Sequence, residues 1–408
     1  MGRRASAAVP TKGRASALAL VASVLVAAAA ASVTGSAAGA PPPHSFRGVV
    51  PSTLAGQSQA PTGRLVYHGG PVMRTNTTYS IYWAPAGFSY QSGYDSAIDK
   101  YLRDVASASG SFSNVYAISA QYSDSSGPIA YRSTFAGSFH DTSPYPRSGC
   151  DDSPYASVCL TDAQLQAELV SFTAAHHLPV NGTTMYFLFT PLDVGSCFDA
   201  GSSDCSYHQF CAYHGNAGSL IYANMPYADQ NNAGAACDIE PHPNGNQADA
   251  TINVTSHEHI ESVTDPYGTG WYDANGYEIA DLCAWTFGIP LGATQSGGYN
   301  QSIGTGVYEL QQEWSNSAAG CGLNAMPPKI TSFTPTVGKA GTTVTISGTN
   351  LGNATSVTLR NVAVTSFTVL SPTKVRALVP RLSNGPAYWK ITTPGGTATS
   401  PSTFFYLG

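Results

Sequence analysis

The eight cysteines of this 408-residue chain set the strongest limit on its fold. All of them lie between Cys150 and Cys321. An even number of cysteines is typical of chains that fold in an oxidising compartment and form disulfides. No Cys-x-x-Cys spacing occurs, so structural bridges are favoured over metal ligation. The region is therefore expected to contain long loops that are held together by disulfides.

Two of the pairings are predicted individually, Cys150 with Cys159 and Cys283 with Cys321. The other four cysteines pair among themselves in one of about three ways. They are Cys197, Cys205, Cys211 and Cys237. On the chain-entropy model each bridge contributes on the order of 3 kcal/mol to stability.

The first residues have the features of an export signal. Arg3, Arg4, Lys12 and Arg14 occur without any acid and precede an apolar run over 15–33. Small residues follow this run, so cleavage is expected near Ala38. This predicts a signal peptide at 1–38 and a secreted protein that is extracellular or associated with a cell wall. An uncleaved membrane anchor is the alternative, because the run is almost long enough to span a bilayer.

The rest of the chain divides into three segments by composition and periodicity. Residues 39–64 are rich in Pro, Ser, Gly and Gln and predict a disordered lead. Helical and strand patterns then alternate over 65–326, which predicts a disulfide-bonded α/β domain with a mixed, zincin-like sheet. Strands are expected at 77–83, 115–118, 185–189 and 220–223, and helices around 98–105, 161–172 and 249–264.

The segment after Pro327-Pro328 contains only short strand-like runs separated by Gly, Pro and Asn, which predicts an all-β sandwich at 327–408. The runs Ile330–Pro335 and Val344–Gly348 and the ending Trp389–Gly396 resemble the IPT/TIG immunoglobulin-like domain. That resemblance implies an immunoglobulin-like fold. It implies no particular function, since such modules act as spacers, ligand binders or dimerisation units.

Charge separates the two predicted domains. Residues 39–326 carry 7 basic and 24 acidic side chains, a net charge of −17. Residues 327–408 carry 7 basic side chains and no acid. A domain as acidic as the first repels phosphates, so nucleic acid is excluded as a partner. The basic domain could hold the chain on an anionic wall polymer, or it could dock on the acidic domain.

The strongest chemical signal lies in the predicted helix 249–264. His257 and Glu261 are four residues apart and project from one helical face, as two helical ligands of a metal must. Glu258 is the next residue and is expected to act as the base that activates a water molecule, as in His-Glu-x-x-His hydrolases. Glu261 replaces the second histidine of that motif. The third ligand is expected downstream, with Glu278 first, Asp281 second and Asp265 third.

The ligand chemistry favours Zn²⁺, with Mn²⁺ and Ca²⁺ as alternatives, because a His/Glu/Glu set is harder than His₂Glu. Nine acids between Asp238 and Asp281 support a bound cation of some kind. The competing interpretation is that these acids cap the helix, bind calcium or solvate the surface, and that His257 is a hydrogen-bonded core residue. His208, His214 and His242 are expected in nearby loops as possible further ligands, and His176-His177 as a helix cap.

A second resemblance extends over residues 65–325. Its motifs occur in a fixed order: Tyr67–Val72, Cys211–Gly215, Pro243–Gly245, Ser256–Pro266 and Glu278–Cys283. In this combination the segment resembles the EXORDIUM/phosphate-induced protein 1 family of secreted plant wall proteins and bacterial relatives. The resemblance implies no settled activity. Asp265 stands where the plant proteins commonly have Asn.

Two functional hypotheses follow. The first is a secreted metal-dependent hydrolase, with peptides as the favoured substrate, in which His257, Glu261, Glu278 and Asp281 hold the metal and Glu258 is catalytic. The second is a non-catalytic extracellular protein that binds a cell wall or glycan and has a structural metal site. The expected partner is an extracellular protein or wall polymer, and no membrane is involved after signal cleavage.

Overall fold

The computed structural model describes residues 64–408 except 202, 230–235, 289, 326, 352–353, 355, 372 and 394–395. The predicted signal peptide 1–38, and all of the predicted lead 39–64 except its last residue, lie outside the described residues. No helix within the described part of the chain has the length and apolar character needed to cross a membrane.

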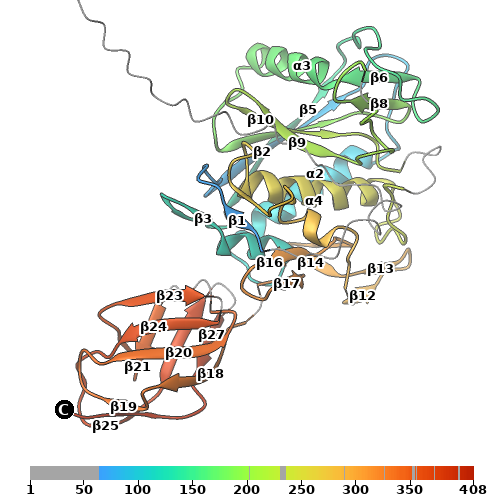
Figure 1. Ribbon diagram of the computed structural model, residues 1–408. Coiled ribbons are helices and arrows are strands. Elements are labelled where there is room, and N and C mark those ends of the chain that lie inside the picture. The colour runs from blue at the N-terminus through green and yellow to red at the C-terminus, as the bar shows by residue number, and fades with distance from the viewer. Residues whose placement is uncertain are drawn as a thin grey trace, which may run out of the picture. The chain divides into compact units, whose positions relative to one another are not determined.

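A five-stranded mixed sheet forms the centre of the N-terminal part (Figure 1). Its strands, in spatial order, are β5 (Ser133–Asp141), β2 (Asn76–Trp83), β7 (Thr184–Phe189), β10 (Leu220–Met225) and β9 (Tyr213–Ala217). The first four strands are parallel, and β9 pairs antiparallel with β10 at the edge. The mixed α/β class predicted for this region is therefore observed, while its zincin-like character stays a prediction.

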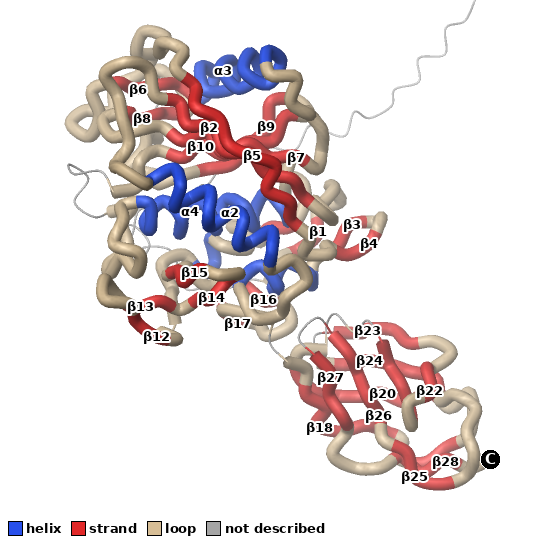
Figure 2. The backbone as a smooth tube through the Cα atoms, turned by 180° about the vertical axis from the view of Figure 1, so that it is seen from behind, coloured by secondary structure: helices blue, strands red, loops and turns tan. Residues whose placement is uncertain are grey.

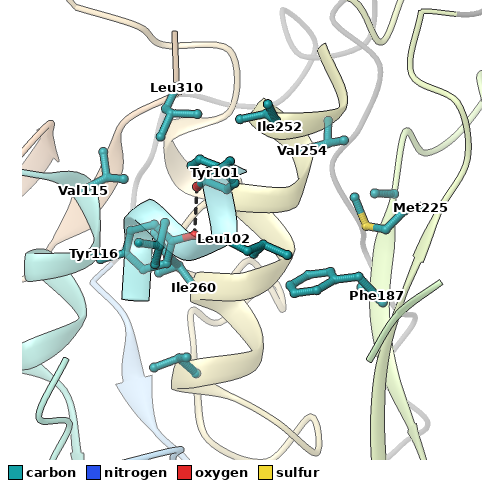
Figure 3. Packing of buried hydrophobic residues seen from close by; sticks show 14 of the residues in the cluster. Tyr101, Leu102, Val115, Tyr116, Phe187, Met225, Ile252, Val254, Ile260 and Leu310 are labelled. Carbon is teal, nitrogen blue, oxygen red and sulfur yellow. Dashed lines mark hydrogen bonds between the residues drawn. The ribbon is translucent and has the colours of Figure 1, made fainter. Parts of the chain in front are cut away.

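Helices cover both faces of this sheet (Figures 1 and 2). They are α2 (Tyr94–Ser107), α3 (Asp162–Ala175) and α4 (Ala248–Thr264). Side chains alternate along β7, so Phe187 packs on the α2 and α4 side, whereas Tyr186 and Leu188 pack toward α3. Figure 3 shows Phe187 and Met225 facing α4, and a hydrogen bond between Tyr101 and Tyr116 across the same core.

The predicted elements were found at most of the expected places. The capping box of Thr161 and Gln164 at the start of α3 is present. The strand expected at 115–118 is wrong, because Val115–Gln121 is the 3-10 helix η1. Asn114 accepts a hydrogen bond from the backbone of Tyr116, and this cap favours a helical turn over an extended chain.

Short strand pairs and disulfides organise the loops around the sheet. The pairs are β1 (Val66–Tyr67) with β11 (Trp271–Tyr272), β3 (Ser123–Asp124) with β4 (Gly127–Pro128), β6 (Val158–Thr161) with β8 (Val194–Cys197), β12 (Gly292–Ala293) with β13 (Gly298–Tyr299), β14 (Gln301–Ile303) with β15 (Gly306–Tyr308), and β16 (Glu313–Ser315) with β17 (Gly320–Gly322). The second 3-10 helix, η2, is Asp281–Cys283.

All eight cysteines are paired. The two pairings predicted individually, Cys150–Cys159 and Cys283–Cys321, are confirmed. The remaining four cysteines form Cys197–Cys205 and Cys211–Cys237. These bridges fit a protein that folds in an oxidising compartment.

The C-terminal part has a separate all-β core around the buried Trp389. One sheet contains β18 (Lys329–Thr334), β20 (Thr343–Thr349), β24 (Lys374–Leu378) and β23 (Phe367–Ser371). A second contains β22 (Val362–Ala363), β21 (Ser356–Leu359), β26 (Trp389–Thr393) and β27 (Gly396–Thr399). A smaller one contains β19 (Val337–Gly338), β28 (Phe404–Tyr406) and β25 (Gly385–Ala387). This arrangement agrees with the predicted immunoglobulin-like sandwich.

The packing of β7 gives a stability prediction. Phe187→Ala should lower the free energy of unfolding of the α/β part by about 3–5 kcal/mol, because a fully buried ring is lost and leaves a cavity. Val170→Ala, at a half-exposed position of α3, should change it by less than about 0.5 kcal/mol. Urea denaturation measures both values, and equal effects of the two substitutions would contradict the packing described here.

Candidate metal centre

Helix α4 carries the centre and is buried along its whole length of 17 residues. It begins next to Asp249, whose carboxylate accepts hydrogen bonds from the backbone and side chain of Asn244. It ends at Thr264, with Asp265 as the C-cap, since Pro266 cannot continue a helix. Many of its residues are polar, so its burial needs partners for each polar group.

His257 and Glu261 lie together on one face of α4, as their spacing predicted. His257 Nε2 is 3.1 Å from Glu261 Oε1 and 3.4 Å from Asp281 Oδ1. Both His257 and Glu261 have no exposed surface. The backbone N–H of Asp281 also donates to Glu261 Oε1 at 3.0 Å. The structure therefore brings Asp281, from the segment after α4, into direct contact with the helical pair.

Glu278 reaches the same place from the start of this downstream segment. Its backbone N–H donates to Asp281 Oδ2 at 3.0 Å, which holds the two acids in one turn. The Cys283–Cys321 disulfide and a hydrogen bond from the backbone of Trp314 to Ile279 attach the turn to β16 and β17. All four predicted metal ligands therefore come together.

His214 joins the centre from the opposite side. It was expected in a loop, but it lies on the edge strand β9, opposite Ala223 of β10. Its Nδ1 is 3.2 Å from Glu258 Oε2 and 3.7 Å from Glu261 Oε2, and its Nε2 is 3.7 Å from Glu278 Oε2. The ring thus touches three of the acids. In the sequence, His214 is a lone histidine in a stretch that was expected to be a loop. A lone loop histidine is too weak a signal to be ranked among the ligands.

Glu258, the predicted catalytic base, lies beside the ligand pair and is fully buried. Asp265, the third candidate for the downstream ligand, holds the turn after α4 through one of its carboxylate oxygens. Its Oδ1 accepts the backbone N–H groups of Thr269 and Gly270 at 2.6 and 2.7 Å and so closes the turn after α4. Gly270 has no room for a side chain there, because a Cβ would lie 2.4 Å from the carbonyl oxygen of Thr264.

Burial and neighbouring charged groups shift the pKa values of the acids and of His214 in the centre. Burial and the neighbouring Asp281 raise the pKa of Glu261 to about 7, although His257 opposes the shift. Burial and the surrounding carboxylates also raise the pKa of Glu278 well above its usual value. Burial would lower the pKa of His214, but Glu258, Glu261 and Asp265 outweigh it and raise this pKa to about 9.

Several buried polar atoms in the centre have no hydrogen-bond partner. They are His257 Nε2, Glu261 Oε2 and Glu278 Oε1. Such atoms are rare in folded proteins unless an ion or water is bound. Two sets of possible ligands have atoms within 4.8 Å of one another, His257/Glu258/Glu261 and His214/Glu261/Glu278. The donor chemistry and the unpartnered atoms both fit a divalent cation.

Two residues near the centre were missed by the sequence analysis. Glu313 on β16 is fully buried, and neither of its carboxylate oxygens has a hydrogen-bond partner. Burial raises its pKa well above the usual value, and His257 opposes this shift. The side-chain amide of Gln311 contacts His257 Nδ1. In the sequence these two residues belong to a short polar run, 311–313. The spacing within this run is not that of a set of metal ligands.

The remaining histidines have other surroundings. His259 faces the core, where Nε2 is 2.9 Å from Asn76 Oδ1 and burial lowers its pKa to about 3. His242 Nε2 is 2.6 Å from Asp238 Oδ1, away from the α4 centre. His208 packs edge-on against Tyr155. None of these three histidines is among the groups that contact His257 or Glu261 in the described part of the chain.

The turn held by Asp265 can be tested by substitution. Asp265→Ala should destabilise the α/β part by about 1–3 kcal/mol, because two backbone N–H groups lose their acceptor. Asp265→Asn keeps an acceptor oxygen and should cost much less. Thermal unfolding of the two variants compares them, and equal losses would show that the turn does not depend on this acceptor.

Comparison with known proteins identifies the C-terminal part. Residues 328–406 match the model of the IPT/TIG domain. Among solved structures, SGBP-B from a xyloglucan utilization locus of Bacteroides uniformis is 23% identical, with 29% of this chain and 35% of that chain covered and a TM-score of 0.20. An auxiliary nutrient binding protein of Bacteroides ovatus is 19% identical, with 20% and 21% covered and a TM-score of 0.18. TM-scores this low carry no functional argument.

The chain is also similar to two plant proteins. Protein EXORDIUM-like 3 of Arabidopsis thaliana is 24% identical over 300 residues, which cover 64% of this chain and 84% of that protein. Protein EXORDIUM-like 5 of the same plant is 26% identical over 264 residues, which cover 58% and 67%. Both resemblances drawn from the motifs are confirmed. The chain combines a region similar to EXORDIUM-like proteins with a C-terminal IPT/TIG domain.

Proposed function

We propose that this protein is a secreted metal-dependent hydrolase with peptides as its favoured substrate. One observation carries the proposal. Glu261 and Asp281 approach the same nitrogen of His257, at 3.1 and 3.4 Å, and Glu258 lies beside them. Two helical ligands, a downstream carboxylate and an adjacent glutamate are the parts that a metallopeptidase needs.

Zn²⁺ is the proposed metal, with Mn²⁺ and Ca²⁺ as alternatives. A set with one imidazole and several carboxylates is harder than the sites of most zinc enzymes, so affinity alone does not select zinc. When bound, the cation would supply Lewis-acid polarisation of the scissile carbonyl. Glu278 and Asp281 would complete the ligand set with His257 and Glu261.

Glu258 is the proposed general base. It accepts a proton from water as the water oxygen adds to the carbonyl carbon. It then delivers this proton to the amide nitrogen as the carbon–nitrogen bond breaks. Glu258 Oε2 lies 3.2 Å from Nδ1 of His214, the second imidazole of the centre.

A second candidate function is favoured by the burial of the centre. His257, Glu258 and Glu261 have no exposed surface, and closed metal sites are typically structural. In this case the cation would connect α4 to the segment 278–281. The protein would then be a non-catalytic wall or glycan binder. The IPT/TIG domain would provide its binding surface.

The charge of the IPT/TIG domain supports that binding role. Lys374 and Arg376 are exposed on β24, two residues apart, and therefore project from the same face of the sheet. The neighbouring strands place Thr345 and Thr368 beside Arg376. No acid occurs between 327 and 408 to neutralise these cations within the domain. An anionic wall polymer is the matching partner.

Metal content and peptide hydrolysis by the purified full chain test the first proposal. Glu258→Gln should keep the metal and lower kcat/KM by about 100- to 10,000-fold, the usual range for loss of a general base. Glu240→Gln, at an exposed position, is the matched control and should leave kcat/KM unchanged. If the protein retains metal but does not hydrolyse peptides, the structural alternative is favoured. The same holds if Glu258→Gln leaves hydrolysis unchanged.

Salt-dependent binding tests the second candidate. The full chain should bind isolated anionic wall polymer, and binding should weaken steeply as salt rises, because exposed charges are screened. The double variant Lys374→Ser/Arg376→Ser should bind less at low salt. Arg132→Ser/Arg147→Ser, which removes two exposed cations from the α/β part, is the matched control. Equal binding by both double variants would argue against this face.

A further inference from the structure

We infer that the α4 centre holds two divalent cations, one on each side of Glu261. The two oxygens of this carboxylate face different histidines. Oε1 is 3.1 Å from His257 Nε2, and Oε2 is 3.7 Å from His214 Nδ1. The inference rests on the metal centre of the proposed function and adds a second ion to it.

The first position lies at His257. Its Nε2 is fully buried and has Glu261 Oε1 and Asp281 Oδ1 as neighbours at 3.1 and 3.4 Å. The other ring nitrogen, Nδ1, contacts the amide of Gln311. In the structure the amide nitrogen of Gln311 lies at Nδ1. Turning this amide over would let its oxygen accept Nδ1–H and leave the lone pair of Nε2 facing the two carboxylates, which is the arrangement that ligation of a cation by Nε2 needs. A histidine that ligates a metal is typically held in this way.

The second position lies at His214 and has the same design. Its Nε2 is 3.2 Å from the backbone carbonyl oxygen of Asp265, which fixes the proton on Nε2. Nδ1 then presents its lone pair to Glu258 Oε2 at 3.2 Å and Glu261 Oε2 at 3.7 Å. Glu261 Oε2 is buried and has no hydrogen-bond partner. Glu278 Oε2 is 3.7 Å from the other ring nitrogen, Nε2, and one possible ligand atom each of His214, Glu261 and Glu278 lie within 4.8 Å of one another.

Charge and geometry both favour a pair of ions. Five carboxylates converge here, from Glu258, Glu261, Glu278, Asp281 and Glu313. A single cation would leave the rest of their charge to be balanced by protons on the acids, whereas a second cation balances more of it. A carboxylate with one oxygen on each ion bridges metals about 3.5–4 Å apart, the spacing of two-metal hydrolases.

Metal stoichiometry of the full chain tests the inference. Protein equilibrated with Zn²⁺ and then freed of excess ion should hold two ions per chain by elemental analysis. His214→Ala and His257→Ala should each hold one, because each substitution removes the only imidazole of one position. His208→Ala, an exposed histidine outside the centre, is the matched control and should hold two. Near-ultraviolet circular dichroism establishes that each variant is folded.

A measurement on the unaltered protein avoids any folding defect of the variants. Two Mn²⁺ ions bridged by Glu261 should give an exchange-coupled electron paramagnetic resonance spectrum. One ion per chain, or the six-line spectrum of isolated Mn²⁺, would overturn the second position while leaving the proposed single-metal hydrolase intact. No bound ion would overturn both.

Discussion

Burial of negative charge along α4 is the constraint on which the centre depends. Carboxylates removed from water destabilise the folded state unless a proton or a cation balances them. Glu258 and Glu261 have no exposed surface, and Glu278 and Asp281 are packed against them. The pKa values of Glu261 and Glu278 are raised for the same reason, because burial and neighbouring negative charges favour the neutral acids. Metal binding would remove this penalty, so we expect cation affinity and folding to be coupled.

The scaffold explains how acids from distant segments are held against this repulsion. The central sheet places His214 on its antiparallel edge strand β9, directly against α4. The Cys283–Cys321 disulfide fastens the turn with Glu278 and Asp281 to β16 and β17. Asp265 closes the chain after the helix through two backbone hydrogen bonds. Each contact limits how far the carboxylates can separate, so the proposed cation would find its ligands already close together.

The same burial bears on the choice between catalysis and a structural role. Glu278 and His214 keep a small exposed fraction, 14% and 8% of their side chains, whereas His257 and Glu261 have none. Glu278 and His214 therefore form the side of the centre that is nearer to solvent. A hydrolase would use that side for the peptide, and a structural site would close it. The IPT/TIG domain, which carries seven cations and no acid, adds a surface whose charge is opposite to that of the rest of the chain.

The sequence by itself determined the features that depend on local patterns. Apolar periodicity, the Thr161 capping box and Pro266 were enough for α3 and α4, and the His257–Glu261 pair followed from the helical repeat. Only the tertiary structure decided the rest of the centre. His214 and Glu258 are 44 residues apart, and Gln311 and His257 are 54 apart, so no local pattern connects them. The strand expected at 115–118 is a different case, because the Asn114 cap that favours the 3-10 helix is a local feature, to which Gln301 adds a distant contact with the backbone of Val115. Contacts between distant segments arise from packing of the whole fold, and a short stretch of sequence does not encode them.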